Sequence, residues 1–193
     1  MIRNDVRTLV PTHFGNWLER YGDTWSSQIS ELKEKFGDSV VEVHYPGKQA
    51  VEVPVVVVKR ESLLEVLRFL KNEVKYHFLA DLTATDEHPD SVRFHMVYNL
   101  MSHQNDFIRI RVKTYLTEEE PVVDSIVSLW PGANFHEREV WDMFGVQFAG
   151  HPNLRRILMD ERWDGHPLRK DYPLQGYQFF PTPQEVDADQ LKD

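Results

Sequence analysis

Residues 93–115 of the chain read RFHMVYNLMSHQNDFIRIRVKTY, and this stretch decides the fold. Apolar and polar residues alternate through residues 93–100 and again through residues 107–115. A period of two is typical of strands that bury one face, because successive side chains point to opposite sides of a sheet. The polar residues 102–106 between the two runs predict a turn. The stretch therefore predicts two neighbouring strands of an antiparallel sheet.

The chain before this stretch predicts two helices and three further strands. Apolar residues recur at helical spacing in residues 23–36, where Asp23 is the expected N-cap, and again in residues 61–73. The strands are expected at residues 40–45, 51–58 and 76–85.

Prolines and acidic residues mark the connections between these elements. Pro46 and Gly47 predict a tight turn that joins the first two strands into a hairpin. Pro54 suggests that the second strand lies at an edge or carries a bulge. The acidic residues 81–90 lack the central glycine of a calcium-binding loop, so a solvated turn is expected there.

The chain after the stretch contains two helices and then loses its periodicity. A short helix is expected at residues 121–130, and a second helix at residues 134–144, ended by Gly145. Beyond Gly145 proline, glycine, histidine and arginine dominate, which is typical of an irregular segment.

These elements predict an α+β fold: a largely antiparallel sheet with helices on one face, followed by a long irregular C-terminal extension. The expected divisions are an N-terminal segment (1–22), the α+β domain (23–145), an irregular partner-wrapping extension (146–180) and a flexible acidic tail (181–193).

Composition excludes several classes of function. The net charge of −9 in 193 residues argues against binding to nucleic acid or to anionic lipid. The absence of cysteine excludes disulfides, thiolate catalysis and cysteine-held iron–sulfur clusters on this polypeptide. The longest aliphatic run, residues 55–58, is too short to span a bilayer. The first seven residues predict neither a secretory signal nor a transit peptide.

The helix expected at residues 134–144 places carboxylates among apolar residues. On a helical wheel its apolar residues cover most of the circumference, with Glu137 and Glu139 between them, while Arg138 and Asp142 share a polar stripe. Such a helix must be covered on several sides. Buried carboxylates also need cations or hydrogen-bond donors, because an isolated buried charge is strongly destabilising.

Two related segments supply candidate cations. Residues 150–156 and 165–170 each contain Gly-His-Pro followed by leucine and two cations. Arginine suits bidentate pairing with carboxylates. The cations either neutralise the carboxylates of the helix within the chain or pair with carboxylates of another protein.

Residues 137–144, EREVWDMF, followed by His151, Arg155 and residues 157–158, resemble a signature of the thirty-kilodalton subunit of NADH–quinone oxidoreductase, respiratory complex I. Three further stretches resemble the same family, and the resemblance spans about residues 23–177. These stretches are residues 80–84, 97–100 and 165–174.

The resemblance implies a structural or assembly subunit of the peripheral arm of a proton-pumping NADH:quinone oxidoreductase (a translocase). Such a subunit has no catalytic, cofactor-binding or metal-binding residues, and FMN and iron–sulfur clusters are expected on partner subunits. The implied partners are other peripheral-arm subunits, especially those flanking the quinone site, on the cytoplasmic side of the bacterial plasma membrane. Neither nucleic acid nor direct membrane insertion is expected.

The same resemblance implies an interface, and two departures from the family are minor. Phe135 stands where the family often has tryptophan, and a fused second domain at the C-terminus is not expected. The expected interface and structural residues are Glu137, Arg138, Glu139, Trp141, Asp142, Phe144, His151, Arg155, Arg156, His166, Arg169, Lys170 and Tyr172.

Two alternative functions remain open. A stand-alone hydrolase or lyase could use His136 and nearby carboxylates, but the zinc motif His-Glu-x-x-His fails because residue 140 is valine. Glu137 and Glu139 would also point to different sides of a helix. An equivalent scaffold subunit of a membrane-bound hydrogenase or of a ferredoxin- or deazaflavin-linked dehydrogenase is the other alternative. The complete stretch HPLRKDYPL at residues 166–174 favours complex I.

Overall fold

The computed structural model describes residues 17–46 and 53–176. Its main helices are α1 (Trp17–Phe36), α2 (Leu63–Asn72) and α3 (Ala133–Phe144), with short 3-10 turns at Gly37–Ser39 and Arg60–Ser62. Its strands are β1 (Val40–His44), β2 (Val55–Val58), β3 (Phe78–Asp86), β4 (Phe94–Ser102), β5 (Ile108–Leu116), β6 (Val122–Asp124) and β7 (Gln147–Ala149).

Five strands form the main sheet in the order β1-β2-β5-β4-β3. The hairpin predicted from residues 93–115 is confirmed, with β4 and β5 antiparallel and Val97 opposite Lys113. Strand pairs β1–β2 and β3–β4 are also antiparallel, while β2 and β5 run parallel. The parallel pair arises because α2, β3 and β4 separate β2 from β5 along the chain.

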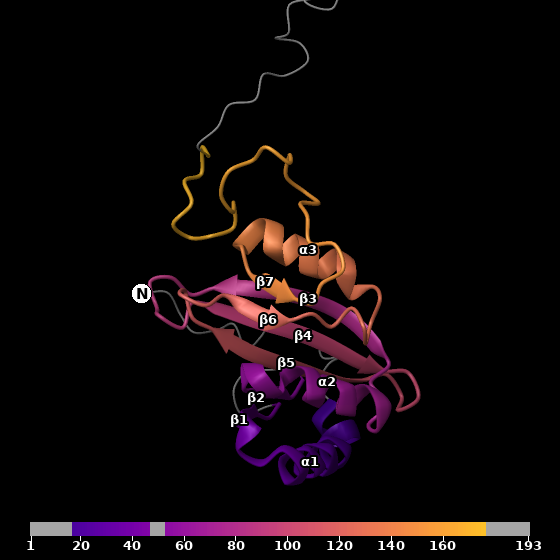
Figure 1. Cartoon of the computed structure of the whole chain (residues 1–193). Helices are drawn as coiled ribbons and strands as arrows, with labels where there is room; N and C mark the ends of the chain where they lie inside the picture. The colour runs from indigo at the N-terminus through magenta and orange to yellow at the C-terminus, as the bar shows by residue number, and fades with distance from the viewer. Residues whose placement is uncertain (1–16, 47–52, 177–193) are drawn as a thin grey trace, which may run out of the picture.

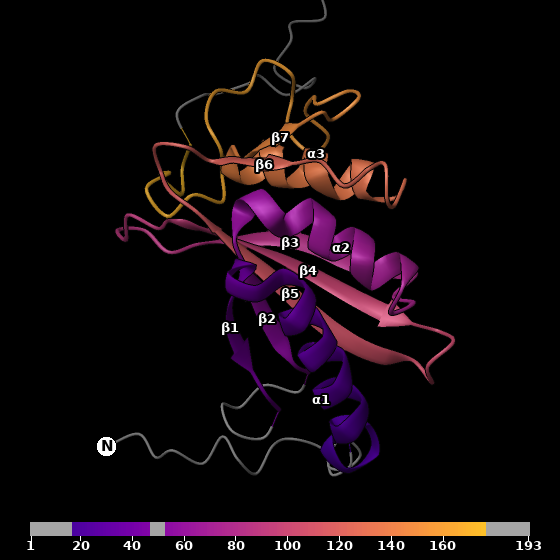
Figure 2. The ribbon, with the colours of Figure 1, turned by 60° about the horizontal axis from the view of Figure 1, so that its bottom comes forward.

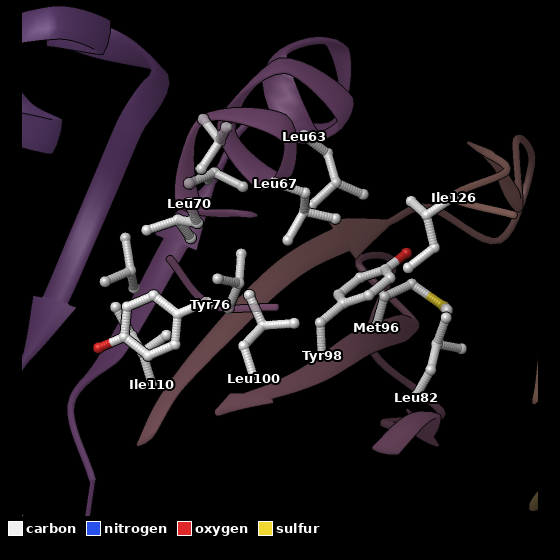
Figure 3. Packing of buried hydrophobic residues seen from close by; sticks show 14 of the residues in the cluster. Leu63, Leu67, Leu70, Tyr76, Leu82, Met96, Tyr98, Leu100, Ile110 and Ile126 are labelled. Carbon is white, nitrogen blue, oxygen red and sulfur yellow. The ribbon is translucent and has the colours of Figure 1, made fainter. Parts of the chain in front are cut away.

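One hydrophobic cluster joins the three helices to one face of the sheet. It contains Trp25 of α1, Leu67 of α2, Tyr98 of β4, Ile110 of β5 and Val140 of α3. In Figure 3 the leucines of α2 point toward the side chains of Tyr98 and Leu100. Burial of each such side chain contributes about 1.5–3 kcal/mol. The expectation of helices on one face of a largely antiparallel sheet is confirmed.

The helices follow one another across the sheet. Figure 2 shows α1 and α2 in front of the strands, with α3 beyond α2. Helix α3 lies against β3, the edge strand. The chain leaves α3 at Gly145 and continues outward as the orange and yellow segment of Figure 1. The end of α3 is therefore the point where the extension begins.

The helix predicted at residues 121–130 is wrong, because residues 122–124 form strand β6. This strand pairs in parallel with β7, and α3 connects the two. Three residues carry too little periodicity to reveal a strand, and the pairing partner lies more than twenty residues further along.

Three other expectations are corrected at their boundaries. Helix α1 begins at Trp17 and not at Asp23, and Tyr21 is buried within it. Pro54 lies just before β2, whose position between β1 and β5 is internal, so the edge expectation is wrong. Asp86 is 5% exposed, so the acidic stretch 81–90 is not solvated throughout. The predicted turn at Gly47 lies outside the described residues.

Between residues 150 and 176 the chain forms turns and bends without a helix or strand, as the fading periodicity predicted. Residues 177–193 lie outside the described part. Within the described ranges, none of the helices combines the length and the apolar character that crossing a bilayer requires.

Candidate functional site

Asp142, in the last turn of α3, is completely buried and organises the start of the extension. Its Oδ2 atom accepts hydrogen bonds from the backbone N–H groups of Ile157, Leu158 and Met159 at 3.0, 2.8 and 2.9 Å. Burial alone would raise the pKa of Asp142, but these donors and Arg156 outweigh it and hold the pKa below its usual value. The carboxylate therefore fixes the backbone of the extension over α3.

Arg156 is the cation that neutralises Asp142. Its Nη1 atom donates to Asp142 Oδ1 at 2.5 Å. Its Nη2 atom donates to the carbonyls of Trp163 and Gly165 at 2.7 and 3.1 Å. The guanidinium lies 5.7 Å from the centre of the Trp141 ring, within the range of a cation–π contact. One arginine thus joins α3 to two separate turns of the extension.

Glu137 is also completely buried, but its partners are neutral. Its carboxylate accepts hydrogen bonds from the Ser125 hydroxyl and the Ile126 N–H, both at 2.7 Å. Burial raises the pKa of Glu137 to about 7, and the two hydrogen bonds oppose that rise only in part. Since both donors follow β6, Glu137 attaches α3 to the strand that precedes it.

His151 lies beside Glu137 at the first Gly-His-Pro turn. Its Nε2 atom is 4.0 Å from Glu137 Oε2 and 3.4 Å from the Asn134 carbonyl oxygen. The backbone N–H of Asn153 donates to Nδ1 at 3.0 Å, which assigns the ring hydrogen to Nε2. The His151 side chain is fully covered, so it serves as a packed connector between α3 and the extension.

The second Gly-His-Pro turn closes over the C-terminal end of α3. His166 Nδ1 lies 3.0 Å from the Asp142 carbonyl oxygen, and burial lowers the pKa of this histidine. The backbone N–H of Leu168 donates to the Met143 carbonyl at 3.0 Å, and Arg169 Nε donates to the Phe144 carbonyl at 2.6 Å. These contacts satisfy carbonyls that a helix end leaves without intrahelical partners.

Gly145 makes this approach possible. Its φ of +79° ends α3 in the left-handed region, where glycine is favoured. A Cβ atom at residue 145 would lie 2.6 Å from His166 Nε2, which is closer than any van der Waals contact allows, and it would also clash with Arg169. The two halves of the site meet through the space that this glycine leaves.

A second polar centre, which sequence reasoning missed, lies around Arg93. Its Nε and Nη2 atoms donate to the two oxygens of Asp86 at 2.9 Å each, and Arg93 and Asp86 are both buried. The same guanidinium pairs with Asp171 at 2.6 Å and with Glu118 at 2.6 Å. The Lys170 N–H donates to Asp86 at 2.8 Å. Arg93 thereby ties the far end of the extension to the sheet.

The within-chain pairing of the predicted cations and carboxylates is only partly confirmed. Arg156 neutralises Asp142, but Glu137 has hydroxyl and amide donors, and Glu139 is exposed. The polar stripe expected for Arg138 and Asp142 is wrong for Asp142, because the extension covers it. A helical wheel describes only one helix and contains no information about what packs on it.

The remaining predicted residues surround the same joint. Arg138 donates to the carbonyls of Arg155 and Arg156 at 3.1 and 2.8 Å. Phe144 is buried, Trp141 is partly buried, and Arg155 and Lys170 are exposed. The Tyr172 hydroxyl lies 3.5 Å from the Asp164 carbonyl oxygen.

The geometry gives little support to a catalytic centre at His136. Its Nδ1 atom lies 3.9 Å from Asp81, and the neighbouring Glu137 has no exposed surface that a substrate could reach. Across residues 17–46 and 53–176, no three histidine, aspartate or glutamate side chains gather as a metal ion requires. The polar groups described above bind one part of the chain to another.

Comparison with known proteins gives the family. Residues 56–178 match the family described as "Respiratory-chain NADH dehydrogenase, 30 Kd subunit". An NADH-quinone oxidoreductase subunit of Citrifermentans bemidjiense is 48% identical over 149 residues, which cover 77% of this chain and 89% of that protein.

Two solved structures are similar to this one. The trypsin-resistant fragment of Nqo5 has a TM-score of 0.57 and 33% identity, covering 67% of this chain and 98% of the fragment. A chain of the membrane-bound sulfane sulfur reductase, an archaeal respiratory membrane complex, has a TM-score of 0.66 at 22% identity, covering 84% of this chain and 98% of that one. The second likeness shows the fold alone. By the extent of the family match and the identity to the bacterial relative, this chain belongs to the family of the 30 kDa subunit of the respiratory-chain NADH dehydrogenase.

Proposed function

We propose that this chain is a cofactor-free structural subunit of the peripheral arm of a proton-pumping NADH:quinone oxidoreductase. It stabilises the quinone-reducing module and takes part in its assembly, while FMN, the iron–sulfur clusters and the reacting groups belong to neighbouring subunits. It lies on the cytoplasmic side of the membrane, where its partner subunits hold it.

The extension carries this proposal. From residue 149 to residue 176 no apolar side chain is buried, although Asp142, Arg156 and Arg93 fix the segment in a defined path. The leucine side chains at 158, 168 and 174 are 61%, 54% and 107% exposed. A segment held at polar points with its leucines in solvent is suited to burying them against another polypeptide.

Replacing Leu158, Leu168 and Leu174 together by serine tests the proposal. We expect the purified chain to unfold at an unchanged temperature, because these side chains bury little in it. We expect fewer assembled complexes on native gels, with NADH:quinone activity falling in the same proportion. Val92→Ser, an exposed apolar residue in the β3–β4 turn, is the matched control and should leave assembly unchanged.

Two results would contradict the proposal. Normal assembly combined with lost electron transfer per complex would indicate a catalytic role for the chain. Turnover of a substrate by the isolated chain would favour the hydrolase alternative. Mass spectrometry of the proteins that purify with the native chain distinguishes complex I from a related membrane-bound complex as the host.

A further inference from the structure

The face of the main sheet opposite the apolar cluster carries a row of polar and charged side chains. Helices α1, α2 and α3 all contribute to the cluster on the other face, although His136 of α3 comes within 3.9 Å of Asp81 at the β3 edge of this one. Strand pairing places Asp81 beside Asn99 and Asn99 beside Arg111, in a row across β3, β4 and β5. Met101 and Lys113 occupy neighbouring positions of the same face. We call this surface the open face.

Arg111 is held in a fixed orientation on the open face. Its Nε atom donates to Asn99 Oδ1 at 2.8 Å, and Asn99 Nδ2 lies 3.5 Å from Asp81 Oδ2. Among the described residues, the two terminal guanidinium nitrogens of Arg111 donate to no partner. A guanidinium oriented through Nε presents its other donors as a fork, which matches the two oxygens of a carboxylate.

Arg111 is the centre of a basic row on β5. Arg109, Arg111 and Lys113 are alternate residues of this strand, so their side chains leave the same face about 7 Å apart. This row is cationic in a chain whose net charge is −9. The charge pattern favours an acidic partner at this face and disfavours nucleic acid or an anionic membrane, which the rest of the surface repels.

Apolar side chains border the row. A hollow of about 620 Å³ beside the row is lined by the polar side chains of Asp81, Asn99, Arg109 and Arg111 and by apolar side chains that include Phe78, Met101 and Val53. The Phe78 side chain is 45% exposed, and its ring centre lies 5.4 Å from that of His103. A surface that combines a fixed arginine with exposed aromatic and methionine side chains has the composition of an interface core.

We propose that the open face binds an acidic, extended segment of a neighbouring subunit, with one carboxylate on Arg111 and an apolar side chain in the hollow beside Phe78 and Met101. The inference rests on the proposed function, because it requires that the chain works within an assembly. It adds a second contact surface, on the side of the sheet away from the helices and distinct from the extension.

Charge reversal in the assembled complex tests the inference. With a tagged full-length chain, we expect Arg111→Glu to lower the recovery of companion subunits by about tenfold or more, and Arg111→Gln to lower it less. Lys33→Glu, an exposed residue of α1 on the helical side, makes the same charge change and should leave recovery unchanged. Equal melting temperatures of the purified variants show that the fold is intact.

A second measurement leaves Arg111 in place. A photoreactive phenylalanine analogue at position 101 should crosslink to a companion subunit within a peptide that contains aspartate or glutamate. The inference is overturned if Arg111→Glu and Lys33→Glu assemble equally well, or if position 101 crosslinks only to lipid or to nothing. If the unaltered chain recovers no companion subunits, the proposed function itself is contradicted. The experiment therefore distinguishes failure of the proposed function from failure of the inference about the open face.

Discussion

The domain and the extension of this chain are stabilised in different ways. The domain, residues 17–145 in the described part, packs three helices and a sheet around one apolar cluster. The described extension, residues 146–176, buries apolar side chains only at Val146 and Phe148. Beyond them its path depends on the covered side chain of His151 and on hydrogen bonds to Asp142, Arg93 and the end of α3.

The two regions show that the interactions that define the path of a chain differ from those that contribute most to its stability. Apolar burial stabilises a domain without any partner, because it removes a large hydrocarbon area from water. Hydrogen bonds and ion pairs define a path but contribute little net free energy, since water offers the same bonds in the unfolded state. Apolar burial therefore stabilises residues 17–145 in the described part, whereas the described extension follows a defined path with its leucines exposed.

Removing Arg93 would affect both regions and is expected to have the largest effect. Arg93→Ala leaves Asp86 buried without its cation and releases Asp171 of the extension. Breaking a buried ion pair from one side costs about 3–5 kcal/mol. Chemical denaturation of the full chain should show this loss. Arg162→Ala breaks an ion pair on the surface of the extension and should leave the midpoint unchanged. Equal midpoints for the two variants would contradict the role assigned to Arg93.

Glu137 should give the domain a distinctive dependence on pH. The folded chain holds the Glu137 proton up to about pH 7, whereas an unfolded glutamate releases it near 4.5. Between these values the folded state binds more protons, so the free energy of unfolding falls as the pH rises toward 7 and is level above it. At about 1.4 kcal/mol per pKa unit, this pKa difference corresponds to a fall of about 3–4 kcal/mol.

Glu137→Gln should remove most of this fall, because an amide keeps an acceptor for Ser125 and does not ionise. Unfolding curves at pH 5 and pH 8 measure the difference. Glu139→Gln, an exposed residue two positions along the same helix, is the control and should keep the fall of the unaltered chain. An equal fall with Glu137→Gln would assign the titration to another group.

Asp142→Asn should affect the extension alone and have the smallest effect on global stability. The amide weakens the anchor for Ile157, Leu158 and Met159, but these groups and Arg156 can move into water together. We expect a loss of about 1–2 kcal/mol. Hydrogen exchange should become fast in the extension while β3–β5 stay protected. Unchanged exchange at residues 157–159 would show that the carboxylate does not determine the path.

Short sequence patterns were sufficient to predict strands β4 and β5 and the end of α3. The alternation in residues 93–115 gave β4 and β5 because each strand buries one face along its whole length. The end of α3 was predicted from Gly145 alone, because glycine favours the left-handed conformation that ends a helix. Strand β6 was missed because it is three residues long and becomes a strand only by pairing with β7.

That the expected residues form an interface stays a prediction, and the contacts among them within the chain were predicted only in part. The two Gly-His-Pro segments were predicted as a source of cations for carboxylates, yet their sequence did not indicate which carboxylate each cation would approach. The Arg93 centre joins residues 86, 118 and 171, and no short pattern relates positions so far apart. The sequence shows only separate charged residues at these positions. The fold brings the three carboxylates to Arg93.

Gly145 has two structural roles, and a substitution at this residue would affect both. The hydrogen atom in place of a side chain both ends α3 and leaves room for His166 and Arg169, residues more than twenty positions later. An alanine at residue 145 would be strained in the left-handed backbone conformation that ends α3. Its Cβ atom would also displace the second Gly-His-Pro turn. A change at residue 145 therefore alters the helix terminus and the packing of the extension on it at the same time.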